Sequence, residues 1–349
     1  MLSLSLQPNE FDAAFIPANV ASDANIRRAG PSRYTLFMRL VAGDVGGTKT
    51  LLCCVEADGT FVKTIRYDST AWPAFDDLLR DFFAEGIPGP IDAACFAVAG
   101  PVLNKRADVT NVGWIMEESA LAAAFGFARV SLINDFYAIG LGVPMLQPSD
   151  LLSLQQGIRD RNAPIAILGA GTGLGEALVV NIGGTHHVIP GEGGHADFSP
   201  QDDEQVRLLL HLQKIYGHVS SERVVSGMGL VNIFTFLGGE EISAADIGER
   251  ASAGDPLAMH TFRIFVDAYG AEAGDVGIRT LARGGVYLAG GIAAKNIPWF
   301  TDGAFVDAFN RKGRFTDVMR TIPVDLIVNE QVGLLGAVEG ARRTMNDER

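Results

Sequence analysis

Apolar runs separated by glycine-rich turns dominate the first third of the chain. Leu40 to Ala42 are continuously apolar, as expected for a strand buried on both faces, and a glycine turn and a second apolar run follow. The second run ends at Asp58-Gly59, and an Asp-Gly pair between apolar runs is a strong hairpin signal. The pattern therefore predicts strand, turn and strand over this stretch.

The turn itself comes close to a P-loop, whose pattern is G-x-x-x-x-G-K-[ST]. Gly43 to Thr50 fit this pattern except that Thr48 replaces the second glycine. A P-loop opens a helix, whereas this turn opens an apolar run, so we favour a hairpin. Its glycines allow several N–H groups to surround a small concavity that suits a phosphate. Asp44 stands beside this concavity, where a carboxylate can hold Mg²⁺ through water.

The same layout recurs in the second half of the chain. Pro164–Glu192 contains an apolar strand, a glycine turn at Gly169–Gly175, a strand Ala177–Val180, a Gly183-Gly184 turn and a short strand His186–Ile189. A third glycine turn, Gly290-Gly291, follows the apolar strand Val286–Ala289. A triphosphate held between two domains needs a cradle from each side, so the repeats indicate a nucleotide site. The alternative is three unrelated structural turns.

Helical spacing of apolar residues predicts most of the remaining elements. We expect helices at Phe75–Glu85, Glu117–Phe125, Asp203–Tyr216, Glu222–Leu237, Pro256–Arg283 and Val332–Arg343, the fifth interrupted by Gly270, Gly274 and Gly277. Buried strands are expected at Ile91–Val98 and Val130–Ile133. Asn134 and Asp135 stand at the carboxyl end of the second of these strands, which is where open α/β sheets bind ligands.

Composition narrows the function classes. A chain of 349 residues is long enough for two domains, and a net charge of −13 argues against nucleic acid as a partner. The three cysteines lie in apolar runs and resemble small buried hydrophobes of a reducing compartment. No apolar run approaches the ~18 residues of a membrane span, and residues 1–35 have no signal-peptide pattern. We therefore expect a cytoplasmic protein with no membrane partner, and residues 1–35 to be an extension without chemistry.

Several motifs together resemble a known superfamily. DVGGTKT, LGAGTGLG and LAGGI are similar to the phosphate-1, phosphate-2 and adenosine motifs of the sugar kinase, actin and Hsp70 superfamily. INDFYA (133–138), PGEGGH (190–195) and SSERVVSG (220–227) resemble bacterial-type glucokinase. The resemblance runs in order from about Met38 nearly to the C-terminus. It implies a two-domain α/β fold of the actin-like ATPase (ribonuclease H-like) type, with ATP and sugar in the interdomain cleft.

By this resemblance the small domain comprises residues 36–146 with 332–349, and the large domain residues 147–331. The resemblance also implies the nucleotide-binding residues Asp44, Val45, Gly46, Gly47, Thr48, Lys49, Gly169, Gly171, Thr172, Gly173, Gly290 and Gly291. Lys49 departs from the Asn expected at its position, so its contact with ATP is left open between a phosphate point charge and a solvent-exposed side chain.

Phosphoryl transfer needs a group that receives the proton of the acceptor hydroxyl. From the residues alone, Asp135 serves equally well as that base or as the cap of the following helix. The resemblance favours the base.

The implied sugar-binding residues supply the mixture of donors and acceptors that polyol recognition requires. They are Asn134, Asp135, Glu192, His195 and Glu222, with Gly100 and Asn111 at the other edge of the sugar. His195 alone is equally compatible with a structural or metal-bound histidine, and Glu222 with an acid at a helix N-terminus. ROK-type relatives pair such a histidine with a cysteine-rich zinc motif; no C-x-C or C-x-x-C cluster occurs here, so we expect no structural zinc.

The resemblance implies an ATP- and Mg²⁺-dependent glucokinase that makes glucose 6-phosphate in the first step of glycolysis. Mannose, fructose or an N-acetylhexosamine as substrate, and a non-catalytic sugar sensor, are the alternatives. The partners expected are glucose and ATP, and assembly as a homodimer is left open.

Overall fold

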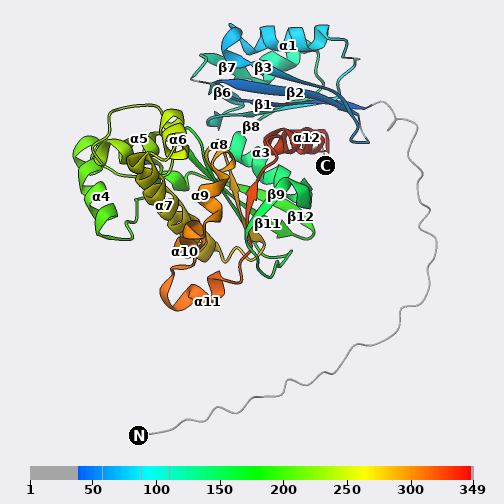
Figure 1. The fold of residues 1–349 in the computed structure, drawn as a ribbon. Coiled ribbons are helices and arrows are strands. Elements are labelled where there is room, and N and C mark those ends of the chain that lie inside the picture. Colours follow the sequence, from blue (N-terminus) through cyan, green and yellow to red (C-terminus); the bar gives the residue numbers. More distant parts are fainter. Residues whose placement is uncertain (1–37, 57, 88, 110, 347–349) are drawn as a thin grey trace, which may run out of the picture. The chain divides into compact units, whose positions relative to one another are not determined.

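The computed structural model describes residues 38–346 except 57, 88 and 110, and the expected extension at residues 1–35 lies outside this range. Two main β-sheets organise the described chain (Figure 1). The first has the strand order β3-β2-β1-β4-β8 and the second the order β12-β11-β10-β13-β14-β9. A three-stranded sheet of β5 (Val102–Leu103), β6 (Arg106–Val109) and β7 (Trp114–Glu117) accompanies the first.

The first sheet contains the predicted opening hairpin. Its strands are β1 (Arg39–Val45), β2 (Lys49–Glu56), β3 (Phe61–Asp68), β4 (Ala93–Val98) and β8 (Val130–Asn134). β1 and β2 are antiparallel, so a strand and not a helix follows the glycine turn. β1, β4 and β8 run parallel, which places their carboxyl ends at one edge of the sheet. The hairpin is confirmed and the P-loop alternative is excluded.

Helices cover both faces of this sheet (Figure 1). α1 (Phe75–Ala84) and α2 (Glu118–Phe125) contribute to an apolar core with β1 and β4. On the opposite face, α3 (Asp135–Gly142) and the C-terminal helix α12 (Val332–Asn346) pack against the sheet and against each other. The two helices approach closely because Gly336 lies against the carbonyl oxygen of Ala138, where a Cβ would have no room.

The second sheet repeats the hairpin layout. Its strands are β9 (Leu151–Gln155), β10 (Ile165–Ala170), β11 (Leu174–Ile182), β12 (Thr185–Gly191), β13 (Gly285–Ala289) and β14 (Val324–Ile327). α4 (Asp203–Tyr216), α5 (Gly227–Phe236), α6 (Ala244–Ser252) and α7 (Pro256–Thr280) form the largest apolar core with it. The short helices α8 (Gly291–Lys295), α9 (Ile297–Thr301), α10 (Ala304–Asn310) and α11 (Thr316–Met319) lie between β13 and β14.

Two of the expected boundaries were wrong. The second glycine turn spans only Gly171–Gly173, because Gly169 and Gly175 pair with each other across β10 and β11. The helix expected from Glu222 begins instead at Gly227, after the Ser226 side chain, which accepts the N–H of Gly229 at 3.0 Å. Glu222 lies in a separate 3₁₀ turn, Ser221–Arg223.

The long helix α7 runs without interruption, contrary to the expectation that its glycines break it. These glycines serve close packing. A Cβ on Gly274 would lie 2.5 Å from the carbonyl oxygen of Phe309, and one on Gly270 would meet the carbonyl oxygen of Phe305. Their helix-breaking tendency is therefore outweighed by the close approach of the segment around α10.

Candidate active site

The parallel strands of the first sheet bring two predicted carboxylates to the same edge. Asp44 pairs with Ala97 and Val98 pairs with Asn134, so the ends of β1, β4 and β8 are level with one another. Asp135 follows directly as the first residue of α3. Because ligands bind beyond the carboxyl ends of parallel strands, this edge is the expected place for chemistry.

The two carboxylates influence each other's ionisation. Burial, together with the negative charge of Asp44, raises the pKa of Asp135 to about 6, while a hydrogen bond from the N–H of Phe136 opposes the shift. Burial also raises the pKa of Asp44 to about 6, an effect that the Lys49 cation opposes. When two carboxylates lie close enough to repel each other, a bound cation or proton relieves the repulsion.

Asp44 also lies against the start of α12. A Cβ on Gly333 would lie 2.9 Å from the Oδ2 atom of Asp44, so only glycine lets the helix approach the carboxylate this closely. A carboxylate near a helix N-terminus is favourably placed with respect to the helix dipole. The motifs around residue 44 gave no indication of this contact, which joins segments almost 290 residues apart in sequence.

Asn134, rather than Asp135, caps α3. Its Oδ1 atom accepts the N–H groups of Phe136 at 2.9 Å and Tyr137 at 3.1 Å. Its Nδ2 atom donates to the carbonyl oxygen of Gly100 at 3.2 Å, which brings two predicted sugar-site residues together. Asp135 shares the N–H of Phe136, at 2.9 Å from its Oδ1, and accepts none from Tyr137. The capping role that the sequence left open for Asp135 therefore belongs mainly to Asn134.

The first glycine turn is held by internal hydrogen bonds. The N–H of Gly46 donates to the carbonyl oxygen of Lys49 at 3.0 Å, and the Ser69 hydroxyl donates to the carbonyl oxygen of Gly46 at 2.7 Å. Asn111, predicted at the edge of the sugar, lies against Gly47, where a Cβ would come within 2.6 Å of it. Val45 ends β1 and Thr48 is exposed. The structure thus places Asn111 beside the first glycine turn.

Lys49 extends from the same turn and forms a partly exposed ion pair, its Nζ atom 3.4 Å from an oxygen of Glu330. Glu330 precedes α12. The pair connects the first glycine turn to the start of the C-terminal helix, and both alternatives for Lys49 stay open.

The second glycine turn closes on α5. The N–H of Gly171 donates to the carbonyl oxygen of Gly173 at 2.8 Å. The N–H of Gly227 donates to the carbonyl oxygen of Gly171, also at 2.8 Å. Thr172 forms the tip of this turn. Gly169 lies outside the turn, in β10, where a Cβ would come within 2.6 Å of the Phe136 ring.

The third glycine turn lies beside the second. Gly290 follows β13 with φ of +85°, and a Cβ there would lie 2.5 Å from the carbonyl oxygen of Ala170. Gly291 begins α8. Because β13 pairs in parallel with β10, both turns emerge at the same edge of the second sheet.

The remaining predicted sugar-site residues lie on two connected turns. The Glu222 Oε2 atom accepts the N–H of Leu174 at 2.9 Å. Glu192 and His195 lie 3.9 Å apart on the other turn, and their side chains are 77% and 63% exposed, which leaves their polar groups accessible. The N–H of Ser221 donates to the carbonyl oxygen of Ala196 at 2.9 Å and so links the two turns.

Within the described part of the chain, Asp135 makes no hydrogen bond or ion pair with Glu192, His195 or Glu222. The group of three or more His, Cys, Asp or Glu side chains that a metal centre requires is also absent from the described residues. Asp44 nonetheless suits Mg²⁺, which takes oxygen ligands, keeps several waters and commonly uses one or two carboxylates with substrate phosphates.

The family of the chain follows from comparison with known proteins. The family model described as glucokinase matches residues 41–344. The chain belongs to the glucokinase family. It is 39% identical over 338 residues to a glucokinase of Nostoc sp. strain PCC 7120, an alignment that covers 87% of this chain and 99% of the relative. The resemblance seen in the motifs is thereby confirmed, and the chain is an enzyme of this family.

Solved structures agree with this family. A glucokinase from an Antarctic psychrotroph superimposes with a TM-score of 0.78 at 28% identity, covering 88% of this chain and 99% of that one. A ROK-family glucokinase from Streptomyces griseus, solved in complex with glucose and AMPPNP, matches in fold with a TM-score of 0.58 at 21% identity, covering 87% and 99% of the two chains. The expected two-domain α/β fold of the actin-like type is confirmed.

Among the described residues no helix is both long and apolar enough to cross a membrane.

Three positions next to the site were missed from the sequence. Phe136 was visible within INDFYA and Ser221 within SSERVVSG, but neither motif reveals what its side chain contacts. Gly333 lies in no motif that we had identified.

Proposed function

We propose that this enzyme transfers the γ-phosphoryl group of ATP to the 6-hydroxyl of glucose, with Asp135 as the general base. The observation that carries the proposal is the state of the Asp135 carboxylate. Asn134 performs most of the capping of α3, so the Asp135 carboxylate is not committed to that role. A pKa of about 6 also makes this carboxylate a stronger base than an ordinary aspartate while keeping it ionised at neutral pH.

In this reaction the sugar O6 forms a bond to the γ-phosphorus while the bond from that phosphorus to the bridging oxygen breaks. The O6 proton passes to Asp135, and ADP leaves. Asn134, Glu192, His195 and Glu222 would bind the other sugar hydroxyls, with Gly100 and Asn111 at the opposite edge. An unpaired buried polar group costs about 1–3 kcal/mol, so a matched set of donors and acceptors supports discrimination among hexoses.

We further propose that the three glycine turns hold ATP. The turns at Gly46–Thr48 and Gly171–Gly173 would bind its phosphates through N–H groups, and Gly290-Gly291 would contact the adenosine. Mg²⁺, held through water by Asp44, would neutralise charge on the phosphates. The complex of a ROK-family glucokinase with glucose and AMPPNP, an ATP analogue, supports this pair of substrates at the level of the fold.

The division of the chain into domains is part of the same proposal. Residues 36–146 with 332–349 would form the small domain, and residues 147–331 the large one. Packing of α12 on β1 and β4 supports the return of the C-terminus to the first domain. Closure of the domains over glucose would exclude water as a competing acceptor. Roles in glycolysis and in the cytoplasm stay predictions.

A coupled assay of ADP release tests the function. The purified enzyme is given Mg-ATP with glucose, mannose, fructose, N-acetylglucosamine or N-acetylmannosamine, and kcat/KM is compared. We expect a strong preference for glucose. Turnover with another hexose alone would contradict glucose as substrate but keep the phosphoryl transfer. If no sugar stimulates release, repeating the panel with ADP and polyphosphate as donors separates a different donor from a non-catalytic sensor.

A further inference from the structure

Two buried glutamates stand behind the proposed sugar site. Glu176 on β11 is 9% exposed and Glu272 on α7 is 6% exposed. The Oε1 atom of each is buried without a hydrogen-bond partner in the described part of the chain. A buried carboxylate that is both ionised and incompletely hydrogen-bonded is strongly unfavourable, so this pair needs a physical explanation.

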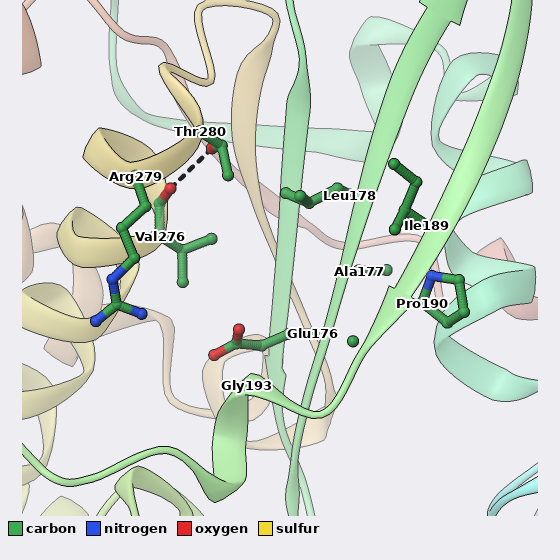
Figure 2. Close-up of a pocket in the computed structure, with 10 residues that line it drawn as sticks. Glu176, Ala177, Leu178, Ile189, Pro190, Gly193, Val276, Arg279 and Thr280 are labelled. Atoms are coloured by element: carbon green, nitrogen blue, oxygen red, sulfur yellow. Dashed lines mark hydrogen bonds between the residues drawn. The ribbon is translucent and has the colours of Figure 1, made fainter.

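Each glutamate contacts one of the two turns that carry sugar-site residues. Glu176 lies directly beneath Gly193, where a Cβ would collide with its carboxylate, and Gly193 lies between Glu192 and His195. Figure 2 shows Glu176 reaching into the space between β11 and α7, beside Gly193. On the other side, the hydroxyl of Ser221, which precedes Glu222, donates to the Oε2 atom of Glu272 at 2.7 Å.

The two turns are also joined directly, by the hydrogen bond from the N–H of Ser221 to the carbonyl oxygen of Ala196. The glutamate pair therefore lies behind a single unit formed by Gly193–His195 and Ser221–Arg223. Because each carboxylate contacts one of these turns, repulsion between the carboxylates would push the two turns apart.

Several charged groups face the pair. Burial, together with the charge of Glu272, raises the pKa of Glu176 to about 7, and the Arg279 cation opposes the shift. Burial also raises the pKa of Glu272, which the Ser221 hydroxyl, Arg279 and Lys312 lower and Asp275 raises. The charge of Glu176 in turn raises the pKa of the Tyr269 hydroxyl. Two carboxylates that interact this way titrate as a pair.

Protons can reach the pair from one side. A cavity of about 200 Å³ borders Glu176 between α7 and the β11–β12 hairpin (Figure 2). Arg279 and Ile189 line it and are 56% and 49% exposed, so its rim reaches solvent. The protonation state of Glu176 is thus able to follow the pH of the solution.

We propose that Glu176 and Glu272, each buried against one of the two turns, hold one proton between them at neutral pH and act together as positioning residues that keep the Gly193–His195 and Ser221–Arg223 turns in the geometry for sugar binding. This inference rests on the proposed function, because it takes Glu192, His195 and Glu222 as sugar ligands. Loss of the shared proton places two like charges in one buried site. Their repulsion pushes the turns apart and weakens sugar binding, while the phosphoryl transfer at Asp135 is affected less.

The test compares wild type with Glu176→Gln, which keeps the shape of the side chain and removes its charge. Between about pH 6 and about pH 8.5, we expect the wild-type KM for glucose to rise by about threefold to tenfold, with a smaller change in kcat. In Glu176→Gln this rise should disappear. Glu272→Gln should also reduce it, and the exposed Glu249→Gln on α6 serves as the matched control that should retain it.

A second measurement keeps the inference testable without catalysis. Because the folded-state pKa of Glu176 is raised, the stability that this group contributes is present at low pH and is lost as the pH rises through about 7. The free energy of urea unfolding should therefore fall between about pH 4.5 and about pH 7.5 in wild type more than in Glu176→Gln or Glu272→Gln, because the unfolded carboxyl titrates near 4.5 and the folded one near 7.

A wild-type KM that does not change with pH, or a rise that both glutamine variants retain, would overturn the positioning role. Identical pH dependences of unfolding in wild type and both variants would overturn the shared proton. Failure of the proposed function looks different, since wild type would then turn over no glucose at any pH. In that case the unfolding measurement still decides whether the pair holds a proton, and the positioning role in sugar binding falls with the function.

Discussion

The ring of Phe136 occupies the space that a Cβ on Gly175 would fill. The same ring lies 2.6 Å from the ideal Cβ position of Gly169, the partner of Gly175 across β10 and β11. Phe136 directly follows Asp135, so the residue after the proposed base is seated on two paired glycines of the second sheet. The position of Asp135 therefore depends on a packing contact with a segment almost 40 residues away in sequence.

Gly175→Ala should displace the Phe136 ring. We expect a loss of stability of about 1–3 kcal/mol, as for overpacking of a close contact, together with a lower kcat because Asp135 moves with its neighbour. Urea unfolding and the coupled assay measure the two effects. The double variant Gly175→Ala/Phe136→Leu should be less impaired than the sum of its single substitutions; strict additivity would show that the ring is not the cause.

Asp135→Asn removes the proposed base and keeps the shape of the side chain. We expect kcat to fall by about 10²–10⁴-fold with little change in the affinity for glucose. The variant should be no less stable than wild type above about pH 6, because the raised pKa of Asp135 makes its charged form unfavourable there. Asp203→Asn, at the exposed first residue of α4, is the matched control and should behave as wild type. A near-normal kcat in Asp135→Asn would refute the assignment.

The raised pKa of Asp135 also predicts the acid limb of the pH–rate profile. A general base works only when it is ionised, so kcat/KM for glucose should fall as the pH drops through about 6. An aspartate with an ordinary pKa would give this fall near ~4. Initial rates from about pH 4.5 to about pH 8 locate the midpoint. An acid limb close to pH ~4 would mean that burial and the charge of Asp44 do not raise the pKa of Asp135, which would contradict this prediction.

The same substitution should have opposite effects in two helices. Gly248→Ala in α6 places its Cβ no closer than 3.6 Å to any neighbour, so it should stabilise the protein by up to about 1 kcal/mol. Gly274→Ala in α7 places its Cβ 2.5 Å from the carbonyl oxygen of Phe309, and it should destabilise by about 1–3 kcal/mol. Urea unfolding of the two variants gives the comparison. If Gly274→Ala also stabilised the protein, the close approach at α7 would not explain the glycine.

Local pattern determined much of this protein. The hairpin at residues 39–56 and the helix starting at Phe75 follow from apolar runs, Asp-Gly turns and helical spacing, which act between residues near in sequence. The same local signals identified the glycine turns and placed Asp135 at the end of a strand. The family motifs added the fold and the activity that the comparisons confirm.

Tertiary structure alone decided the roles that depend on distant neighbours. Helical propensity suggested breaks at Gly270 and Gly274, whereas packing against Phe305 and Phe309 keeps α7 continuous. Sequence also could not decide whether Asn134 or Asp135 caps α3, because both residue types cap helices equally well, and the structure assigns most of the capping to Asn134. Nor could it show that Glu176 and Glu272, almost 100 residues apart, are both buried against the turns that carry Glu192, His195 and Glu222. Burial and like-charge repulsion arise only when the chain brings such groups together, and they are what shift the pKa values on which the chemistry depends.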